Sequence, residues 1–223
     1  MGSDSTRPPD APPPDHKVLR EAALAHLARF STTRQGLEQV LLRRVARWEQ
    51  AALKAGAEQE DVRATAAALR PVVAAVVESM AGLGAVDDAA FAHARARRLV
   101  RSGRSGRAVQ AHLAARGVEA DVREAVLQEV VEGFSPAEVE LSSALVLARK
   151  RRLGPFAGAP SLRPPRAAAP EEEGSRGSPE EAEQRRAMGV LARAGFGRDI
   201  AQKVLEMDLV EAQEWMERLR AES

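Results

Sequence analysis

Apolar residues recur at helical spacing along most of the chain, and this periodicity constrains the fold more than any other feature. Leu19, Leu24 and Leu27 share one face of a predicted helix, and Ala, Leu, Arg and Glu fill most of the sequence between such stripes. β-branched runs are almost confined to VVAAVV at 72–77, and strand-like alternation is missing. The sequence therefore predicts an all-α fold.

Capping and stop residues divide this helical pattern into segments. Asp87 or Asp88 can start a helix, because a carboxylate there accepts hydrogen bonds from exposed amides and favours the positive end of the helix dipole. Gly103 ends that helix, Ser105 caps the next one, and Gly117 supplies a left-handed residue that stops it. We expect helices over about 18–29, 33–55, 59–82, 87–101, 105–116, 119–132, 135–152, 180–194, 197–207 and 209–221.

Two segments rich in proline interrupt the pattern. Residues 1–16 are polar and rich in proline, so this tail cannot bury enough apolar surface to offset the entropy of ordering it. The stretch GPFAGAPSLRPPRAAAPEEEGSRGSP at 154–179 is too long and too rich in proline for an ordinary connection within a compact domain. We expect both segments to be disordered, the second as an insert.

Charge balance and the absence of cysteine exclude several classes of function. Lys plus Arg number 33 and Asp plus Glu 32, so a net charge of +1 excludes a polycation that coats nucleic acid. Disulfides, thiol catalysis and thiolate metal sites are excluded, and the four histidines (His16, His26, His93 and His112) are too scattered for a short ligand motif. We expect neither a metal nor a cofactor.

Hydropathy places the chain away from membranes. The N-terminal sequence MGSDSTRPPDAPPPD lacks the apolar region of a signal peptide, and no run of 18 apolar residues occurs. We therefore expect no membrane partner and a cytoplasmic location.

A weak internal repeat groups the expected helices. The segments LARFSTTRQGLEQVL (27–41), LVRSGRSGRAVQAHL (99–113) and LARAGFGRDIAQKVL (191–205) each join an apolar helix end to a polar turn, one Arg and a short helix. We expect three repeats of three helices, over 17–82, 83–133 and 134–223. Because a unit of about 50 residues has little core of its own, neighbouring repeats should bury apolar faces on one another. The sequence predicts an elongated helical array and leaves its curvature open.

The second repeat is strongly basic on one side. On a helix that begins near Ala89, four arginines project over about a third of the circumference: Arg97, Arg98, Arg101 and Arg104. Phe91 falls on the other side, where we expect it to anchor the core. No acid occurs between Ala89 and Val118, whereas 119–141 holds seven acids. Those acids are one expected partner for the arginines, but exposed ion pairs contribute only about 0–1 kcal/mol each, so a binding surface explains the segregation better.

The chemistry of this surface leaves its partner open. Guanidinium groups pair equally well with phosphates and carboxylates, so the arginines fit both DNA and an acidic protein. Trp48, Phe91 and Trp215 fall on apolar helical faces, where core packing is a better explanation than stacking on single-stranded bases.

The second repeat contains a motif that consists of a basic helix opening with two acids and an aromatic residue, a glycine turn, and a helix that ends in Arg-Gly-Val. The motif lies on these residues: Asp87, Asp88, Phe91, Ala92, Arg97, Arg101, Gly103, Arg107, Val109, Leu113, Arg116, Gly117 and Val118. It resembles the central repeat of the RecX family. The flanking repeats are similar to the first and third repeats of that family, over most of 17–215. This chain departs from the pattern at Arg95, Arg104 and Ser105-Gly106, and in the insert at 154–179.

The resemblance implies a function as well as a fold. It implies three tandem three-helix repeats that lie, as a monomer, in the groove of the RecA filament on DNA and mostly inhibit the recombinase, with roles in DNA recombination, DNA repair and the SOS response. It implies no catalytic residue. We expect six arginines to contact the filament or the DNA backbone, namely Arg97, Arg98, Arg101, Arg104, Arg107 and Arg116, and four residues to shape the motif, namely Asp87, Asp88, Phe91 and Gly117. The alternatives are a general nucleic-acid-binding module and a helical scaffold for an acidic protein.

Overall fold

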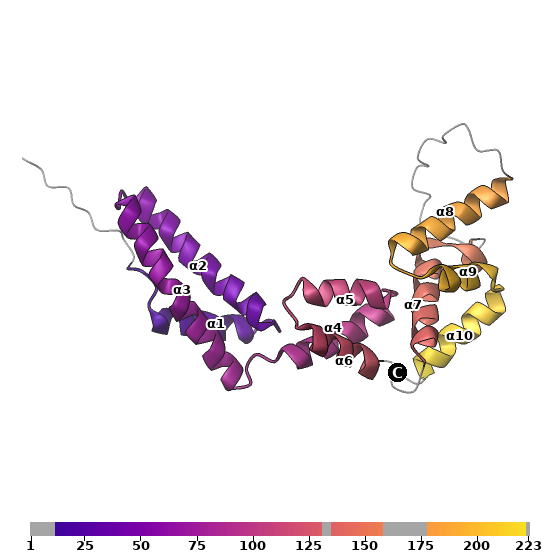
Figure 1. Cartoon of the computed structure of the whole chain (residues 1–223), viewed down its shortest axis with the longest axis horizontal. Coiled ribbons are helices and arrows are strands. Elements are labelled where there is room, and N and C mark those ends of the chain that lie inside the picture. The colour runs from indigo at the N-terminus through magenta and orange to yellow at the C-terminus, as the bar shows by residue number, and fades with distance from the viewer. Residues whose placement is uncertain (1–11, 131–134, 158–177, 222–223) are drawn as a thin grey trace, which may run out of the picture. The chain divides into compact units, whose positions relative to one another are not determined.

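The computed structural model describes residues 12–130, 135–157 and 178–221, and within these ranges every regular element is helical (Figure 1). The all-α prediction is confirmed. Each helix begins and ends within two residues of its expected bounds. Among the described residues the chain forms two compact units, of which unit 1 holds 12–92 and 115–119 and unit 2 holds 93–114 and 120–221.

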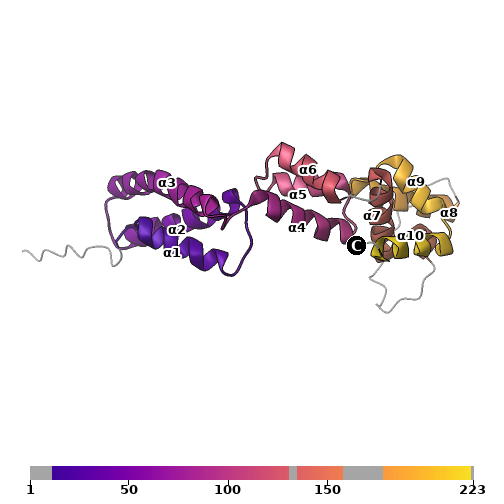
Figure 2. The same ribbon diagram turned by 90° about the horizontal axis from the view of Figure 1, so that it is seen from below.

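Three helices build the core of unit 1: α1 (His16–Leu27), α2 (Arg34–Lys54) and α3 (Gln59–Gly82). Figures 1 and 2 both show them side by side. Leu19, Leu41 and Val76 are among the fully buried residues of this core. Leu24, expected on the apolar face of α1, is 41% exposed, and Ala23 takes its place in the core at 0%. The helix is therefore rotated slightly from the face that leucine spacing alone suggested.

α3 is the one helix in the described part of the chain that is long and apolar enough to cross a membrane. One stripe of the helix, which includes Leu69, Val73 and Met80, packs in the unit 1 core. α3 thus contributes side chains to the core of unit 1. Its length and composition are weak evidence for a membrane span.

The basic region forms α4 (Asp88–Arg101), α5 (Gly106–Ala114) and α6 (Ala120–Val130). Asp87 caps α4, since its carboxylate accepts a hydrogen bond from the Ala90 amide at 2.9 Å. Gly103 (φ 83°) and Gly117 (φ 76°) both adopt the left-handed conformation. The local start and stop signals therefore act as expected.

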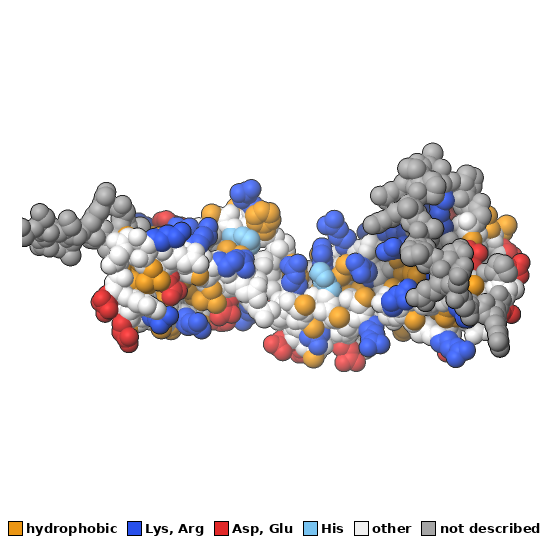
Figure 3. Space-filling view, turned by 90° about the horizontal axis from the view of Figure 1, so that it is seen from above, with side chains coloured by type: hydrophobic (Ala, Val, Ile, Leu, Met, Phe, Trp, Pro, Cys, Tyr) orange, Lys and Arg blue, Asp and Glu red, His pale blue; other side chains and the backbone are white. Residues whose placement is uncertain are grey.

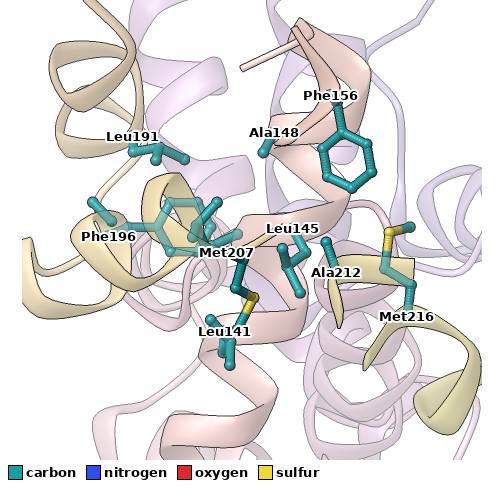
Figure 4. Close-up of a cluster of buried hydrophobic side chains, with 12 residues drawn as sticks. Leu141, Leu145, Ala148, Phe156, Leu191, Phe196, Met207, Ala212 and Met216 are labelled. Atoms are coloured by element: carbon teal, nitrogen blue, oxygen red, sulfur yellow. The ribbon is translucent and has the colours of Figure 1, made fainter. Parts of the chain in front are cut away.

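The rest of unit 2 comprises α7 (Pro136–Arg151), the 3₁₀ turn η1 (Gly154–Phe156), α8 (Pro179–Arg193), α9 (Arg198–Glu206) and α10 (Leu209–Ala221). Their buried side chains form a separate core, in which Leu145, Leu191 and Phe196 meet (Figure 4). Ser135 and Ser178 start α7 and α8 with capping boxes.

The expected disordered segments lie mainly outside the described residues, which exclude 1–11 and 158–177. The described edges of the insert are ordered. Gly154–Phe156 form η1, and Phe156 is 4% exposed because its ring packs in the core of unit 2. Ser178 and Pro179 belong to the start of α8. Where described, these edges of the expected insert are helical structure.

Candidate functional site

Five of the six predicted arginines lie in one continuous stretch of unit 2. Arg97, Arg98 and Arg101 are on α4, Arg104 follows in the turn, and Arg107 lies in the first turn of α5; we call these five the arginine segment. All five side chains are exposed. Figure 3 shows basic side chains over the part of the chain that α4 and α5 form. Arg116, also exposed, belongs to unit 1.

The described carboxylates of the acidic helix α6 form no salt bridge with four of the five arginines. Within the described ranges, no carboxylate forms a salt bridge with Arg97, Arg98, Arg104 or Arg107. On α6, Glu129 lies 3.8 Å from the His93 imidazole, and Arg123 donates to the Gln110 amide oxygen. The sequence left open whether the acids at 119–141 pair with the arginines. These four arginines form no such ion pair with the described acids.

The backbone between α4 and α5 is held firmly by α7. Ser143 Oγ donates to the Val100 carbonyl at 3.3 Å, and Lys150 Nζ donates to the Ser102 carbonyl at 2.7 Å. A Cβ added at Gly103 would lie 2.9 Å from the Leu147 nitrogen, so the two backbones touch at this glycine. Arg101 and Arg104 thus flank a corner whose position is fixed by packing.

Ser105 ties this corner to the turn between α8 and α9. Its side chain is 0% exposed, accepts a hydrogen bond from the Ala108 amide at 3.2 Å, and donates to the Ala194 carbonyl at 2.7 Å. The adjacent Gly106 amide donates to the Glu140 carboxylate at 2.9 Å. Burial raises the pKa of Glu140, and this hydrogen bond opposes the shift.

Unit 1 contains the same arrangement. Thr33, 1% exposed, caps α2 by accepting from the Gly36 amide at 3.0 Å, and its hydroxyl donates to the Arg116 carbonyl at 2.7 Å. The glycine after each accepting carbonyl is left-handed, Gly117 in one case and Gly195 (φ 94°) in the other. In both units, then, a capping hydroxyl also bonds a helix-end carbonyl of the next expected repeat.

The four motif residues have unequal roles. Asp87 caps α4, while the carboxylate of Asp88 accepts from the Arg34 amide at 2.8 Å and so serves the start of α2. A Cβ at Gly117 would overlap the Gln35 side chain, so close approach as well as φ requires glycine. Phe91 is only half-buried, and the fully buried positions on α4 are Ala92 and Ala96. Phe91, expected to anchor the core, is thus partly buried and is not among the residues of the two apolar core clusters.

Phe30 is a candidate that sequence reasoning missed. It lies between α1 and α2 and is 53% exposed. Helical periodicity cannot assign an aromatic residue in a loop to a core. The signal in the sequence was the position of Phe30 in a polar turn beside Arg29, before Ser31 and Thr32.

Three comparisons relate this chain to known proteins. A family model described as RecX, second three-helix domain, matches residues 87–127. The regulatory protein RecX of Myxococcus xanthus is 35% identical over 189 residues, which cover 84% of each chain. That of Thermobifida fusca is 33% identical over 139 residues, or 62% of each. The crystal structure of RecX from Lactobacillus salivarius is similar in fold, with a TM-score of 0.53 at 14% identity over 86% of this chain and 94% of that one.

Proposed function

The chain belongs to the RecX family, and we propose from this premise that it binds the RecA filament on DNA and inhibits recombination. Its relatives carry the name of regulatory proteins, and the proposed action is likewise regulatory. It requires neither a catalytic residue nor a cofactor. A monomer in the cytoplasm, acting in DNA repair and the SOS response, is the form of the protein that this role needs.

The observation that carries the proposal is the exposed arginine segment beside a fixed corner. Arg97, Arg98, Arg104 and Arg107 have no described carboxylate within salt-bridge distance, so their charge is available to a partner. Arginine binds phosphates and carboxylates through paired N–H donors, and a filament groove offers both. Because α7 holds the corner in place, docking costs little backbone entropy.

The proposed mechanism is steric and electrostatic. The basic side of α4 and α5 contacts the DNA backbone and the acidic groups of the filament protein. The rest of the helical chain then occupies the groove and excludes partner DNA or further RecA subunits.

The test is to add the chain to preformed RecA filaments and follow strand exchange and ATP hydrolysis. The triple variant Arg97→Glu/Arg101→Glu/Arg104→Glu should lose inhibition, because attraction becomes repulsion. Helix content and melting should change little, since exposed substitutions usually stay within about 0.5 kcal/mol each. A matched control is Arg186→Glu/Arg193→Glu/Arg198→Glu, which makes the same charge change at exposed positions of unit 2.

The comparison of these two variants decides the proposal. The arginine segment is excluded as the docking surface if its variant inhibits at the wild-type concentration. Equal loss in both variants would indicate general charge attraction instead. A general nucleic-acid-binding module would bind DNA alone as tightly as the filament, and a scaffold for an acidic protein would bind neither.

A further inference from the structure

A cleft of about 380 Å³ opens on unit 1 beside Phe30. Its walls come from the end of α1, the loop to α2, the first turns of α2, and the Ala115–Arg116 turn. The volume lies in the range of small-molecule sites, about 300–1,000 Å³, and suits one nucleotide. We call this feature the Phe30 cleft.

Phe30 gives the cleft an exposed aromatic face. Among the described residues, it is the one aromatic side chain in the group of exposed large apolar residues. The His26 ring lies 5.2 Å from the Phe30 ring, and the Arg29 guanidinium lies 5.4 Å from its centre. The two neighbours support the ring, and the Arg29 guanidinium adds positive charge through a cation–π contact.

The lining of the Phe30 cleft is basic and polar. Arg43 and Arg116 line it, together with the hydroxyls and amides of Ser31, Thr32 and Gln39, and no carboxylate is among the lining side chains. Another cleft of unit 1, about 700 Å³, has the opposite character, with one arginine, Arg34, and five acids: Glu38, Glu78, Asp87, Asp88 and Glu119. The charges around unit 1 are therefore segregated, and anions are attracted to the Phe30 cleft.

Arg116 is placed at the cleft by structure far along the chain. The Thr33 hydroxyl holds the Arg116 carbonyl at 2.7 Å, and Gly117 lies directly against Gln35. Because both contacts involve buried or close-packed backbone, the arginine is supported on a rigid turn. The aromatic ring and the two arginines thus converge from three separate segments.

We propose that the Phe30 cleft binds one nucleotide of single-stranded DNA. The base stacks on the Phe30 ring, Arg43 and Arg116 pair with the flanking phosphates, and the polar side chains contact the base edge. Single-stranded DNA is favoured over duplex because stacking on a protein ring requires an unpaired, unstacked base. It is favoured over an acidic peptide because a carboxylate gains nothing from an exposed ring face.

This site is separate from the arginine segment, on which the proposed action on RecA rests. It lies on unit 1, whereas the arginine segment lies on unit 2. The binding test contains no RecA. A negative result in it therefore does not contradict inhibition of RecA by the arginine segment, and a negative result in the inhibition assay does not contradict binding at the Phe30 cleft.

The experiment measures binding of a fluorescein-labelled oligothymidine strand to the full chain by fluorescence anisotropy at low salt. Phe30→Ala should weaken binding about tenfold, in line with the loss of one stacked base. Phe30→Leu should weaken it as much, while Phe30→Trp should bind at least as tightly as wild type. Leu83→Ala is the control, since Leu83 is an exposed apolar residue of unit 1 at 67% and does not line the cleft.

The phosphate contacts have their own measurement. Arg43→Ala should lower the slope of log affinity against log salt by about 0.7, the value for one released counterion on a single strand. Substitution of Phe30 should leave that slope unchanged. Because Phe30 and Arg43 are exposed, circular dichroism should show wild-type helix content in each variant.

Four outcomes overturn the proposal. Wild-type protein that does not bind oligothymidine at low salt removes the site. Phe30→Ala with wild-type affinity removes the stacking contact. Phe30→Leu that binds as wild type shows a merely apolar contact. Equal affinity of the wild type for duplex and single strand, together with equal affinity of Phe30→Ala and Leu83→Ala for the single strand, also removes the stacking contact.

Discussion

Glu140 is half-buried, and its carboxylate accepts the hydrogen bond from the Gly106 amide at the corner between α4 and α5. Burial raises its pKa, so the native state favours the protonated acid more than the unfolded chain does. The native state then binds more protons, and this residue's contribution to the free energy of unfolding is greatest below its ordinary pKa of 4.5. That contribution is lost as pH rises through the raised native pKa.

Glu140→Gln should therefore gain stability relative to wild type as pH rises from about 4 to 7. Glutamine keeps an oxygen acceptor for the Gly106 amide and has no charge to desolvate. Urea unfolding at the two pH values measures the difference. A wild-type protein that gains on the variant over this interval would show that the hydrogen bond outweighs burial.

Phe91 should contribute less to the free energy of unfolding than a fully buried aromatic residue would. Because the side chain is half-buried, Phe91→Ala should cost about 1–2 kcal/mol, within the ordinary range of single substitutions. Leu113→Ala, at a position 0% exposed, should cost about 2–5 kcal/mol. Chemical unfolding of both variants makes the comparison, and an equal or larger loss at Phe91 would contradict it.

At the scale of elements, the capping hydroxyls of Thr33 and Ser105 each link two helix ends, and the link made by Ser105 can be tested by substitution. Ser105→Ala removes the cap of α5 and the donor to the Ala194 carbonyl, so it should cost about 1–3 kcal/mol. Ser102→Ala is the control in the same turn, because its hydroxyl donates to the Leu99 carbonyl three residues earlier. The control should cost less than about 1 kcal/mol. Thermal unfolding compares the two, and similar losses would mean that the Ser105 contact with Ala194 adds nothing.

The helices were predictable because their limits are local. Asp87, Gly103 and Gly117 act within a few residues of themselves, and their chemistry can be recognised in the sequence. The exposure of Arg97, Arg98, Arg101 and Arg104 followed from helical periodicity. What the sequence did not reveal is long-range. Thr33 looks like a cap and is one, but its second bond reaches a carbonyl 83 residues away, and no pattern of spacing encodes that contact.

At the scale of the whole molecule, the described residues contain two separate clusters of buried apolar side chains, and the buried residues of α4 to α6, such as Val109 and Leu113, belong to neither. Leu41 is fully buried in the core of unit 1, and Leu191 is fully buried in that of unit 2. Each core has its own tryptophan, since Trp48 packs against the first and Trp215 against the second. In a repeat protein, stability is the sum of local terms and neighbour terms, so a change in one core need not be felt equally in the other.

Single-tryptophan variants turn this division into a measurement. In the Trp215→Phe background, Trp48 reports on unit 1, and in the Trp48→Phe background, Trp215 reports on unit 2. Leu41→Ala should remove about 2–5 kcal/mol from the unfolding reported by Trp48 and leave the Trp215 midpoint in urea nearly unchanged. Leu191→Ala should do the reverse. If either substitution moves both midpoints by the same amount, the two cores unfold as one cooperative body, because a shared transition distributes any local loss over the whole chain.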